Sequence, residues 1–362
     1  MPAKNTKRIL VAPLDWGLGH SSRCLPLITY LRGLGHEVVV AGNTWQRSFL
    51  SESCPGIKTI HLEGYNVAYS KKAGGFMFSM FRQLPKILAS IRQEHHWLAE
   101  EVAKHPYDGI ISDNRYGLFH QKVPSVIMTH QLSVRTGLGN AVDEMLRRLH
   151  YKYLRRFPQC WVVDAGSNAN LGGKLSHPKS LPENAGYMGL LSQFRKKNTN
   201  GNQHLLVLLS GPEPQRTLLS DILWEQVQAH KGAVVFVEGS DEINARTGAA
   251  AHISYHLRLA TEQLQPLLEE AGIVICRSGY STLMDLVALG KRAIVIPTPG
   301  QTEQGYLASH LHRAGVFFSC RQKNFNLREA LLAVDEFPFK QLTLQHSFDI
   351  HQEVLNKWLE TI

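Results

Sequence analysis

The chain has 362 residues, of which 43% are hydrophobic and 19% are charged. At about 150 residues per domain this length suits two domains, and the composition is that of a globular protein, which excludes disordered, collagen-like and coiled-coil chains. The five cysteines lie far apart without any C-x-x-C pair, so the sequence predicts neither a disulfide framework nor a zinc knuckle. A reducing compartment, the cytoplasm, is therefore expected.

The net charge of +9 is concentrated in the first half of the chain. Residues 1–188 carry 23 basic against 13 acidic side chains, whereas residues 189–362 carry 16 against 17. A half of the chain with this excess of positive charge is expected to bind nucleic acid, an anionic bilayer or a phosphorylated small molecule. Zinc-finger and RNP signatures are absent from the sequence, so we do not expect nucleic acid. Apolar runs stay below the roughly 18 residues of a membrane span, and we expect a soluble protein without a secretory signal.

Apolar, β-branched runs alternate with helical patterns throughout the first half. Strands are predicted at residues 8–13, 37–41, 57–62, 109–112, 124–129 and 160–163. Helices are predicted between them at residues 25–34, 76–104 and 142–156. Strands separated by helices predict a parallel α/β sheet with helices on both faces.

The same alternation restarts after a polar, unpatterned stretch at residues 191–203, which is typical of a linker. Strands are predicted at residues 204–209, 233–238, 253–256, 273–276, 293–297 and 316–319, with helices at 215–229, 262–271, 281–289 and 303–314. We therefore predict two Rossmann-like, doubly wound domains, residues 1–190 and 204–340, that face a central cleft. Residues 341–362 are helical in pattern, and whether they pack back on the first domain is left open.

The loop after the first strand combines glycines with a histidine. Gly17 and Gly19 allow close approach of the backbone, and His20 follows at the start of the next helix. The alternative is that the glycines only form the turn and His20 packs or caps the helix. The loop is not a dinucleotide fingerprint, because G-x-G-x-x-G would require a third glycine where Ser22 stands.

The loop after the strand at 273–276 is a candidate anion site. Ser278, Gly279, Ser281 and Thr282 place hydroxyls and backbone N–H groups at a helix start, where the helix dipole favours a diphosphate. Asp285 follows one turn later and can accept hydrogen bonds from the vicinal hydroxyls of a ribose. The alternative is a capping box that serves the helix alone.

A third loop, at residues 298–305, leads into another predicted helix. Glu303 and Gln304 offer a carboxylate and an amide to the hydroxyls of a sugar. Alternatively, they are first-turn residues that satisfy the helix dipole.

These three loops together resemble the GT-B glycosyltransferases, and most closely the family 28 type that includes the N-acetylglucosaminyl transferase forming lipid II in peptidoglycan synthesis. The likeness rests on G-L-G-H at 17–20, R-S-G-Y-S-T-L-M-D-L at 277–286 and P-T-P-G-Q-T-E-Q at 297–304. The resemblance implies a GT-B fold, with a C-terminal domain that binds a nucleotide-diphosphate sugar, usually UDP-linked, and an N-terminal domain that binds the acceptor.

Matched position by position, the resemblance assigns roles to these residues. Asp285 falls on the acidic ribose ligand, Ser281 and Thr282 on the diphosphate-binding turn, and Glu303 with Gln304 on the pair that contacts the donor sugar. The resemblance also makes His20 a candidate catalytic base, and its unperturbed pKa near 6.5 suits that role at neutral pH.

Two departures from the family pattern leave alternatives open. Asp15 and Trp16 stand where the family has further glycines, so either the acceptor contacts differ or Asp15 itself is the base. The loop after the first strand of the second domain carries two prolines, which offer no N–H to a phosphate. This leaves Ser210, Gly211 and Arg216 there, and Arg216 or Arg277 is expected to help stabilise the leaving diphosphate.

The acceptor site is less well marked. Gly17, Gly19, Asp113, Arg115 and His130 follow strands of the first domain and are candidate acceptor contacts. The segment at 69–92 combines phenylalanines and methionines with lysines and arginines, and is either a surface that lies in an anionic bilayer, near a lipid-linked acceptor, or a core helix with a basic edge.

We therefore expect an inverting glycosyltransferase that moves a UDP-N-acetylhexosamine or UDP-hexose sugar to a hydroxyl. No D-x-D motif ends a strand, so neither a metal nor any other cofactor is expected. The alternatives are a GT-B sugar-nucleotide epimerase or hydrolase, and a non-catalytic sugar-nucleotide sensor. The expected location is the cytoplasm, with peripheral attachment to the inner face of the cell membrane as an open option.

Overall fold

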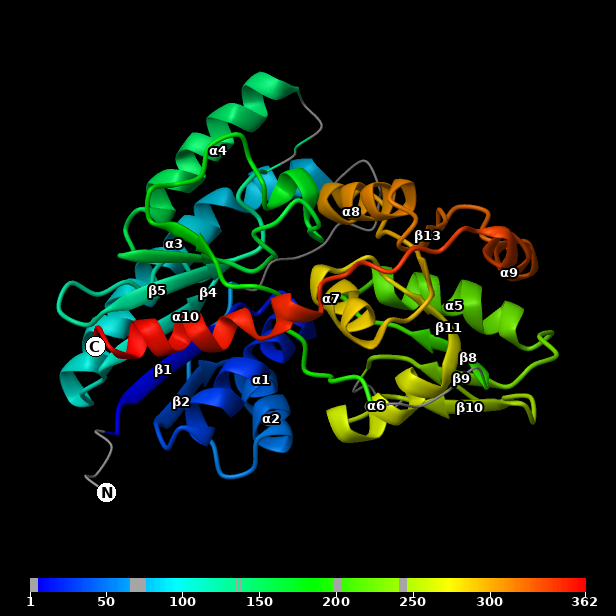
Figure 1. The fold of residues 1–362 in the computed structure, drawn as a ribbon, viewed down its shortest axis with the longest axis horizontal. Helices are drawn as coiled ribbons and strands as arrows, with labels where there is room; N and C mark the ends of the chain where they lie inside the picture. Colours follow the sequence, from blue (N-terminus) through cyan, green and yellow to red (C-terminus); the bar gives the residue numbers. More distant parts are fainter. Residues whose placement is uncertain (1–5, 66–75, 135, 137–138, 198–202, 241–245) are drawn as a thin grey trace. The chain divides into compact units, whose positions relative to one another are not determined.

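The computed structural model of the chain describes residues 6–65, 76–134, 136, 139–197, 203–240 and 246–362. The described residues fall into two compact units (Figure 1). Of the described residues, the first unit draws on 6–65, 80–134, 136, 139–193 and 344–362, and the second on 76–79, 194–197, 203–240 and 246–343.

The described residues of the first unit form a seven-stranded parallel sheet in the order β3-β2-β1-β4-β5-β6-β7. Its strands are β1 (Arg8–Pro13), β2 (Glu37–Gly42), β3 (Lys58–His61), β4 (Gly109–Asp113), β5 (Ser125–Thr129), β6 (Gln159–Val162) and β7 (Ala185–Tyr187). The central strands are apolar and almost completely buried, as parallel strands between two helix layers must be. The register pairs Pro13 with Asp113 and Asp113 with Met128, so the carboxyl ends of β1, β4 and β5 lie side by side.

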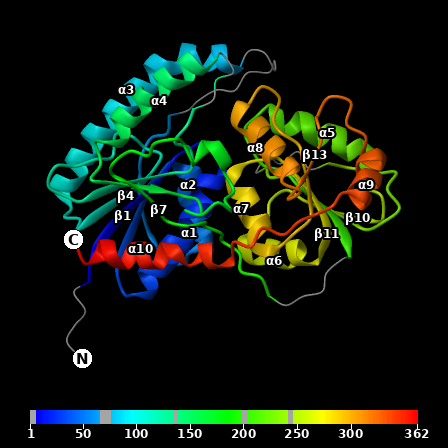
Figure 2. The same cartoon turned by 45° about the horizontal axis from the view of Figure 1, so that its top comes forward.

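The helices of the first unit follow its strands. They are α1 (Leu18–Gly33), α2 (Thr44–Ser53), most of α3 (Phe76–Lys104), α4 (Asn140–Leu154) and α10 (Ile350–Leu359), with short 3-10 turns η2 (Gly173–Leu175) and η3 (Gln345–Phe348). In Figure 2 the helices α3 and α4 run along the same side of the unit.

The final helix, α10, belongs to the first unit. Trp358 is 2% exposed and meets the ring of Trp161 edge-on, with 5.5 Å between the ring centroids. A Cβ on Gly109 would lie 2.4 Å from the Trp358 ring, so β4 begins with a glycine that makes room for it. The hydroxyl of Tyr30 also donates to Asn356, at 3.0 Å. The expected single helix over 341–362 is instead the turn η3 followed by α10.

In the second unit, the described residues form a six-stranded parallel sheet in the order β10-β9-β8-β11-β12-β13. Its strands are β8 (His204–Leu208), β9 (Val234–Val237), β10 (Ile253–His256), β11 (Ala271–Cys276), β12 (Ala293–Val295) and β13 (Phe318–Ser319), and its helices are α5 (Gln215–Val227), α6 (Thr261–Glu270), α7 (Tyr280–Leu289), α8 (Thr302–Arg313) and α9 (Leu327–Glu336). The core on one side of this sheet is a buried cluster that α5 and α9 close, with Leu219, Leu223 and Val334 at 0% exposure.

The predicted alternation of strands and helices is confirmed in both units. The structure adds β7, α2 and α9, which the sequence pattern did not indicate. Part of the expected linker packs on the second unit, where the backbone N–H of Lys197 donates to the buried carboxylate of Glu269 at 3.0 Å.

Candidate functional site

Histidine 20 and aspartate 113 meet at the carboxyl edge of the first sheet, where ligands of such sheets bind. His20 lies in the first turn of α1, whose N-cap Gly17 has a φ of 93° that disfavours any other residue. Asp113 is the last residue of β4. The His20 Nδ1 lies 2.9 Å from Oδ2 of Asp113, and the two side chains are 13% and 0% exposed. A buried carboxylate therefore stands directly behind the imidazole.

Two further side chains complete this cluster, and one of them, Arg23, was not predicted. Its Nε donates to Oδ2 of Asp113 at 2.9 Å, and its Nη2 donates to the other carboxylate oxygen. Its Nη1 lies 2.9 Å from Nδ1 of His130, which follows β5. Arg23 is three residues after His20 in a helix, a spacing that places both on one face and that a search for helical neighbours of His20 would have found.

The cluster shifts the pKa values of its members. Burial lowers the pKa of His20 below its usual 6.5, and the charge of Arg23 lowers it further, whereas Asp113 acts in the opposite direction. Burial alone would raise the pKa of Asp113, but Arg23 and His20 outweigh it and bring the pKa to about 2. The carboxylate is therefore ionised at neutral pH.

The structure corrects the expected acceptor contacts in the first unit. Asp113 is completely buried and bonds to His20 and Arg23, and His130 is 7% exposed against Arg23. Arg115 is also completely buried, because its Nη1 donates to the buried carboxylate of Glu94 at 2.9 Å and its Nε donates to the carbonyl of Pro13 at 2.8 Å. These three side chains are therefore buried beneath the edge of the sheet and bond to other residues of the unit.

Asp15, the other candidate base, has a structural partner. Its Oδ1 accepts a hydrogen bond from the backbone N–H of Tyr65 at 2.9 Å. A Cβ on Gly64 would lie 2.2 Å from its Oδ2, so the chain after β3 wraps closely around this carboxylate. Among the loop glycines, the carbonyl of Gly19 accepts from the hydroxyl of Ser22 at 3.2 Å.

In the second unit, the loops after β8, β11 and β12 are neighbours because these strands are adjacent and parallel. Helix α7 follows β11, and its N-cap residue is Gly279, which has no side chain to cap the helix. Ser281, Thr282 and Asp285 are half-buried, whereas the other residues at positions 280–287 of this helix are buried. The accessible stripe of α7 thus holds two hydroxyls and a carboxylate one turn apart, and their binding of a diphosphate and a ribose stays a prediction.

Arg277 lies beneath these loops and is only 2% exposed. Its guanidinium donates to the carbonyl of Gln215 at 2.5 Å, to that of Ile296 at 3.3 Å and to the side chain of Gln322 at 2.8 Å. Burial lowers its pKa to about 10, which leaves it charged at neutral pH. Arg277 therefore joins the segments that follow β8, β12 and β13, and carries a positive charge beneath them.

Three other predicted donor residues, Ser278, Gln304 and Arg216, bond to neighbours within the second unit. Ser278 is completely buried and donates to the carbonyl of Gln304 at 2.9 Å, and the Gln304 side chain accepts from the backbone N–H of Thr298 at 2.8 Å. The guanidinium of Arg216 bonds to the hydroxyl of Ser240 at 3.1 Å and pairs with Glu213.

The remaining predicted donor residues are Ser210, Gly211, Gly279 and Glu303. Ser210 and the N-cap Gly279 are half-buried, and Gly211 is exposed with a φ of 108°. Glu303 is half-buried in the first turn of α8.

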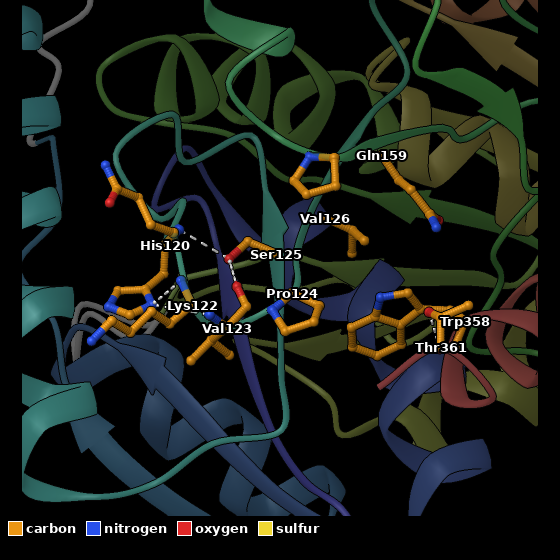
Figure 3. A pocket seen from close by; sticks show the side chains of 11 residues that line it. His120, Lys122, Val123, Pro124, Ser125, Val126, Gln159, Trp358 and Thr361 are labelled. Carbon is orange, nitrogen blue, oxygen red and sulfur yellow. Dashed lines mark hydrogen bonds between the residues drawn. The ribbon is translucent and has the colours of Figure 1, made fainter.

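A pocket of about 240 Å³ lies elsewhere in the first unit (Figure 3). It is lined by Ser125 and Gln159, the first residues of β5 and β6, and by Trp358 of α10, so it opens at the amino ends of the strands. Its polar groups bond to one another: the hydroxyl of Ser125 donates to the carbonyl of Val123 at 2.9 Å and accepts from the backbone N–H of His120 at 3.1 Å. It is not the site predicted from the sequence.

Within the described ranges, no group of three or more His, Cys, Asp or Glu side chains is arranged to hold a metal ion. Likewise, every helix in the described part of the chain is too short or too polar to cross a bilayer. The phenylalanine and methionine side chains at 76–81, part of the predicted bilayer surface, lie outside the described side chains, as do residues 69–75.

Comparisons with known proteins match part of the chain to a family model and the whole chain to one fold. Residues 220–354 match the glycosyltransferase family 28 C-terminal domain. The chain is similar to two proteins named UDP-N-acetylglucosamine–N-acetylmuramyl-(pentapeptide) pyrophosphoryl-undecaprenol N-acetylglucosamine transferase. That of Pasteurella multocida is 25% identical over 342 residues, which are 92% of this chain and 90% of that protein. That of Gloeobacter violaceus is 35% identical over 85 residues, which are 23% of this chain and only 24% of that protein.

Solved structures share the fold across the whole chain. The glycosyltransferase SnogD from Streptomyces nogalater superimposes with a TM-score of 0.61 at 15% identity and covers 99% of this chain and 100% of its own. Acinetobacter baumannii MurG superimposes with a TM-score of 0.56 at 13% identity and covers 98% of this chain and 100% of its own. Both are built, like this chain, on the GT-B fold.

Proposed function

We propose that the chain, a GT-B glycosyltransferase whose residues 220–354 match the glycosyltransferase family 28 C-terminal domain, transfers a sugar from a nucleotide diphosphate to a hydroxyl acceptor with inversion. The observation that carries the proposal is the pairing of His20 with the buried carboxylate of Asp113. In the proposed division of roles, the first unit supplies the base and the second unit binds the donor.

His20 is the proposed base. When its Nδ1–H donates to Asp113, its Nε2 carries the lone pair that takes the proton of the acceptor hydroxyl. Asp113 then stabilises the imidazolium that forms, because its pKa of about 2 keeps it negative. Direct attack of the activated hydroxyl on the sugar carbon, opposite the leaving diphosphate, inverts that carbon. Asp15 is the less suitable base, since its carboxylate already accepts from the backbone of Tyr65.

The N-terminus of α7 is the proposed site of the leaving diphosphate. Its backbone N–H groups and dipole favour an anion, and the hydroxyls of Ser281 and Thr282 lie on its accessible stripe. The buried charge of Arg277 adds a positive potential beneath the same loops. These groups can balance the departing charge without a metal ion, and we propose a metal-independent reaction. Asp285, one turn along the stripe, is the proposed ligand of the ribose hydroxyls.

A UDP-linked N-acetylhexosamine or hexose is the proposed donor. The support is the family 28 domain and the two similar proteins, whose names include UDP-N-acetylglucosamine. Glu303 and Gln304, at the start of α8, are the proposed neighbours of the sugar, although the side-chain oxygen of Gln304 already accepts from Thr298.

A lipid-linked acceptor at an anionic bilayer is the proposed partner, and peripheral attachment is the proposed location. The names of the two similar proteins include a pyrophosphoryl-undecaprenol. In this chain, α4 exposes a stripe in which Met145 and Leu149, at 61% and 44% exposure, alternate with Arg148 and Lys152. Apolar side chains flanked by cations fit an interface with anionic lipids. Leu84 of α3 is also 40% exposed.

A thermal-shift panel of UDP-, GDP-, CDP- and dTDP-sugars tests the donor. A compound that binds only the folded chain raises the unfolding temperature, and we expect this for UDP-sugars in wild type and a smaller rise in Asp285→Asn. Stabilisation by none of the four would contradict the proposal.

Turnover of the stabilising donor tests the reaction. Sugar transfer that requires an added acceptor, persists in EDTA and gives a product of inverted anomeric configuration by NMR is expected. Equal donor consumption with and without acceptor would instead indicate an epimerase or hydrolase.

A further inference from the structure

The guanidinium of Arg23 lies at the centre of the His20 cluster and contacts three titratable groups. Its Nε and Nη2 form a fork on the carboxylate of Asp113. Its Nη1 lies 2.9 Å from Nδ1 of His130, and its Nη2 lies 2.8 Å from Nδ1 of His20. The side chain is only 1% exposed, so these contacts are made away from water.

Proton positions in this cluster follow from the chemistry of arginine, which donates hydrogen bonds and never accepts them. Nδ1 of His130 must therefore be an acceptor, which places the ring proton on Nε2. Nδ1 of His20 has two competing partners: as an acceptor it takes a hydrogen bond from Nη2 of Arg23 at 2.8 Å, and as a donor it gives one to Oδ2 of Asp113 at 2.9 Å. We take the second arrangement, with the Nδ1 proton on the side of Asp113. The carboxylate favours a proton on Nδ1, whereas the guanidinium beside the same atom opposes a positive charge on the ring.

The charged and titratable groups around His20 lie on three elements. Arg23 and the thiol of Cys24 lie on α1, Asp113 ends β4, and His130 follows β5. Asp113 by itself raises the pKa of His20 and so favours the charged form, which cannot act as a base. Arg23 neutralises Asp113 through the two-point contact and leaves the pair without net charge. Burial is the largest cause of the lowered pKa of His20, and the charge of Arg23 lowers it further against the opposing effect of Asp113.

We propose that Arg23 is a positioning residue that keeps His20 unprotonated at neutral pH and aims its Nε2 lone pair at the acceptor, while fixing His130 as an Nε2–H donor. The proposal rests on the proposed function in one respect, namely that His20 is the base. It goes beyond that function because it assigns the protonation state of the base to a residue that does not touch the substrate.

The pH profile of kcat/KM in Arg23→Gln, Arg23→Lys and wild type tests the proposal. Without the guanidinium, the charge of Asp113 acts on His20 unopposed, so the acid limb of Arg23→Gln should move to higher pH by about 1–3 units, with activity recovered at alkaline pH. Arg23→Lys keeps the charge and should keep the limb near that of wild type. Arg32→Gln, on an exposed residue of the same helix, is the matched control. An unchanged limb in a folded Arg23→Gln overturns the proposal.

A measurement on wild type keeps the proposal testable if Arg23→Gln does not fold, and separates it from the proposed function. Long-range 1H–15N NMR, with His20→Gln and His130→Gln used for assignment, reports the protons on each ring nitrogen. At pH 7 we expect a neutral His20 protonated on Nδ1 and a His130 protonated on Nε2. A doubly protonated His20, a neutral His20 with its proton on Nε2, or a His130 proton on Nδ1 overturns the role of Arg23, whereas absence of sugar transfer with the expected ring states intact overturns only the proposed function.

Discussion

Nδ1 of His20 lies 2.9 Å from Oδ2 of Asp113, although the two residues are 93 positions apart in the sequence. They meet because β1 and β4 are adjacent parallel strands, and α1 begins where β1 ends. The pair orients one ring nitrogen and leaves the other for chemistry.

Removing the imidazole should abolish most of the transfer. His20→Gln is expected to lower kcat by about 10²–10⁴, the usual contribution of a positioned base, with little change in the unfolding temperature. Asp15→Asn should stay within about tenfold of wild type, because an asparagine oxygen still accepts from Tyr65. Initial rates of the two variants at saturating donor decide which residue is the base. A larger loss of rate in Asp15→Asn than in His20→Gln would identify Asp15 as the base.

The ionisation of Asp113 should appear in the pH dependence of stability. Its pKa is about 2 in the folded chain against a usual 3.8, so it stabilises the fold above pH 4 and this contribution is lost as the pH falls from about 4 to about 2. The difference in free energy of unfolding between wild type and Asp113→Asn should therefore shrink by about 2 kcal/mol over that range. Urea titrations at several pH values measure it. Glu100→Gln, on an exposed side chain, is the control, and a difference independent of pH would contradict the ion pair.

The hydroxyls at the start of α7 should act on the leaving group. The double variant Ser281→Ala with Thr282→Ala is expected to lower kcat by about 10²–10³, as loss of donors to developing charge does elsewhere. Ser309→Ala, on an exposed residue of α8, should transfer sugar normally. Single-turnover rates separate chemistry from product release, and a normal rate in the double variant would refute the leaving-group assignment.

The carboxylate of Asp285 should act on donor binding. Asp285→Asn loses a charge-assisted acceptor for the ribose hydroxyls, so the donor Kd should rise about tenfold while the acceptor KM stays unchanged. Calorimetry with the UDP-sugar measures the first quantity and steady-state kinetics the second. A fall in kcat with an unchanged donor Kd would place Asp285 outside the donor site.

The exposed face of α4 should govern binding to vesicles. Met145→Ser combined with Leu149→Ser removes two exposed apolar side chains and should weaken partition to anionic vesicles by about tenfold or more. Leu332→Ser on α9, a leucine that is 62% exposed, is the matched control and should bind like wild type. Flotation with anionic and neutral vesicles measures both, and equal flotation of the two variants would remove α4 from the proposed interface.

Parts of the fold that the sequence pattern missed depend on local capping or on neighbours. Helix α2 has a low apolar content, yet Asn43 and Gln46 form a reciprocal capping box at its start, a signal present in the sequence. Strand β7 has only three residues, Ala185–Tyr187, and exists because β6 offers it a free edge. No periodicity can indicate a strand that short.

The sequence by itself determined the alternation of strands and helices, the loops that carry chemistry and the stripe of α7, because apolar periodicity and turn residues act locally. Only the tertiary structure decided which polar side chains face inward. From the sequence, three residues were predicted to contact ligands: Asp113, Arg115 and Arg277. In the structure each side chain is buried and bonds to a residue that lies elsewhere in the sequence. Strand order and register decide which of these residues meet. A buried charge is stable only beside a group that compensates it, so the partner is set by the fold and not by the local sequence.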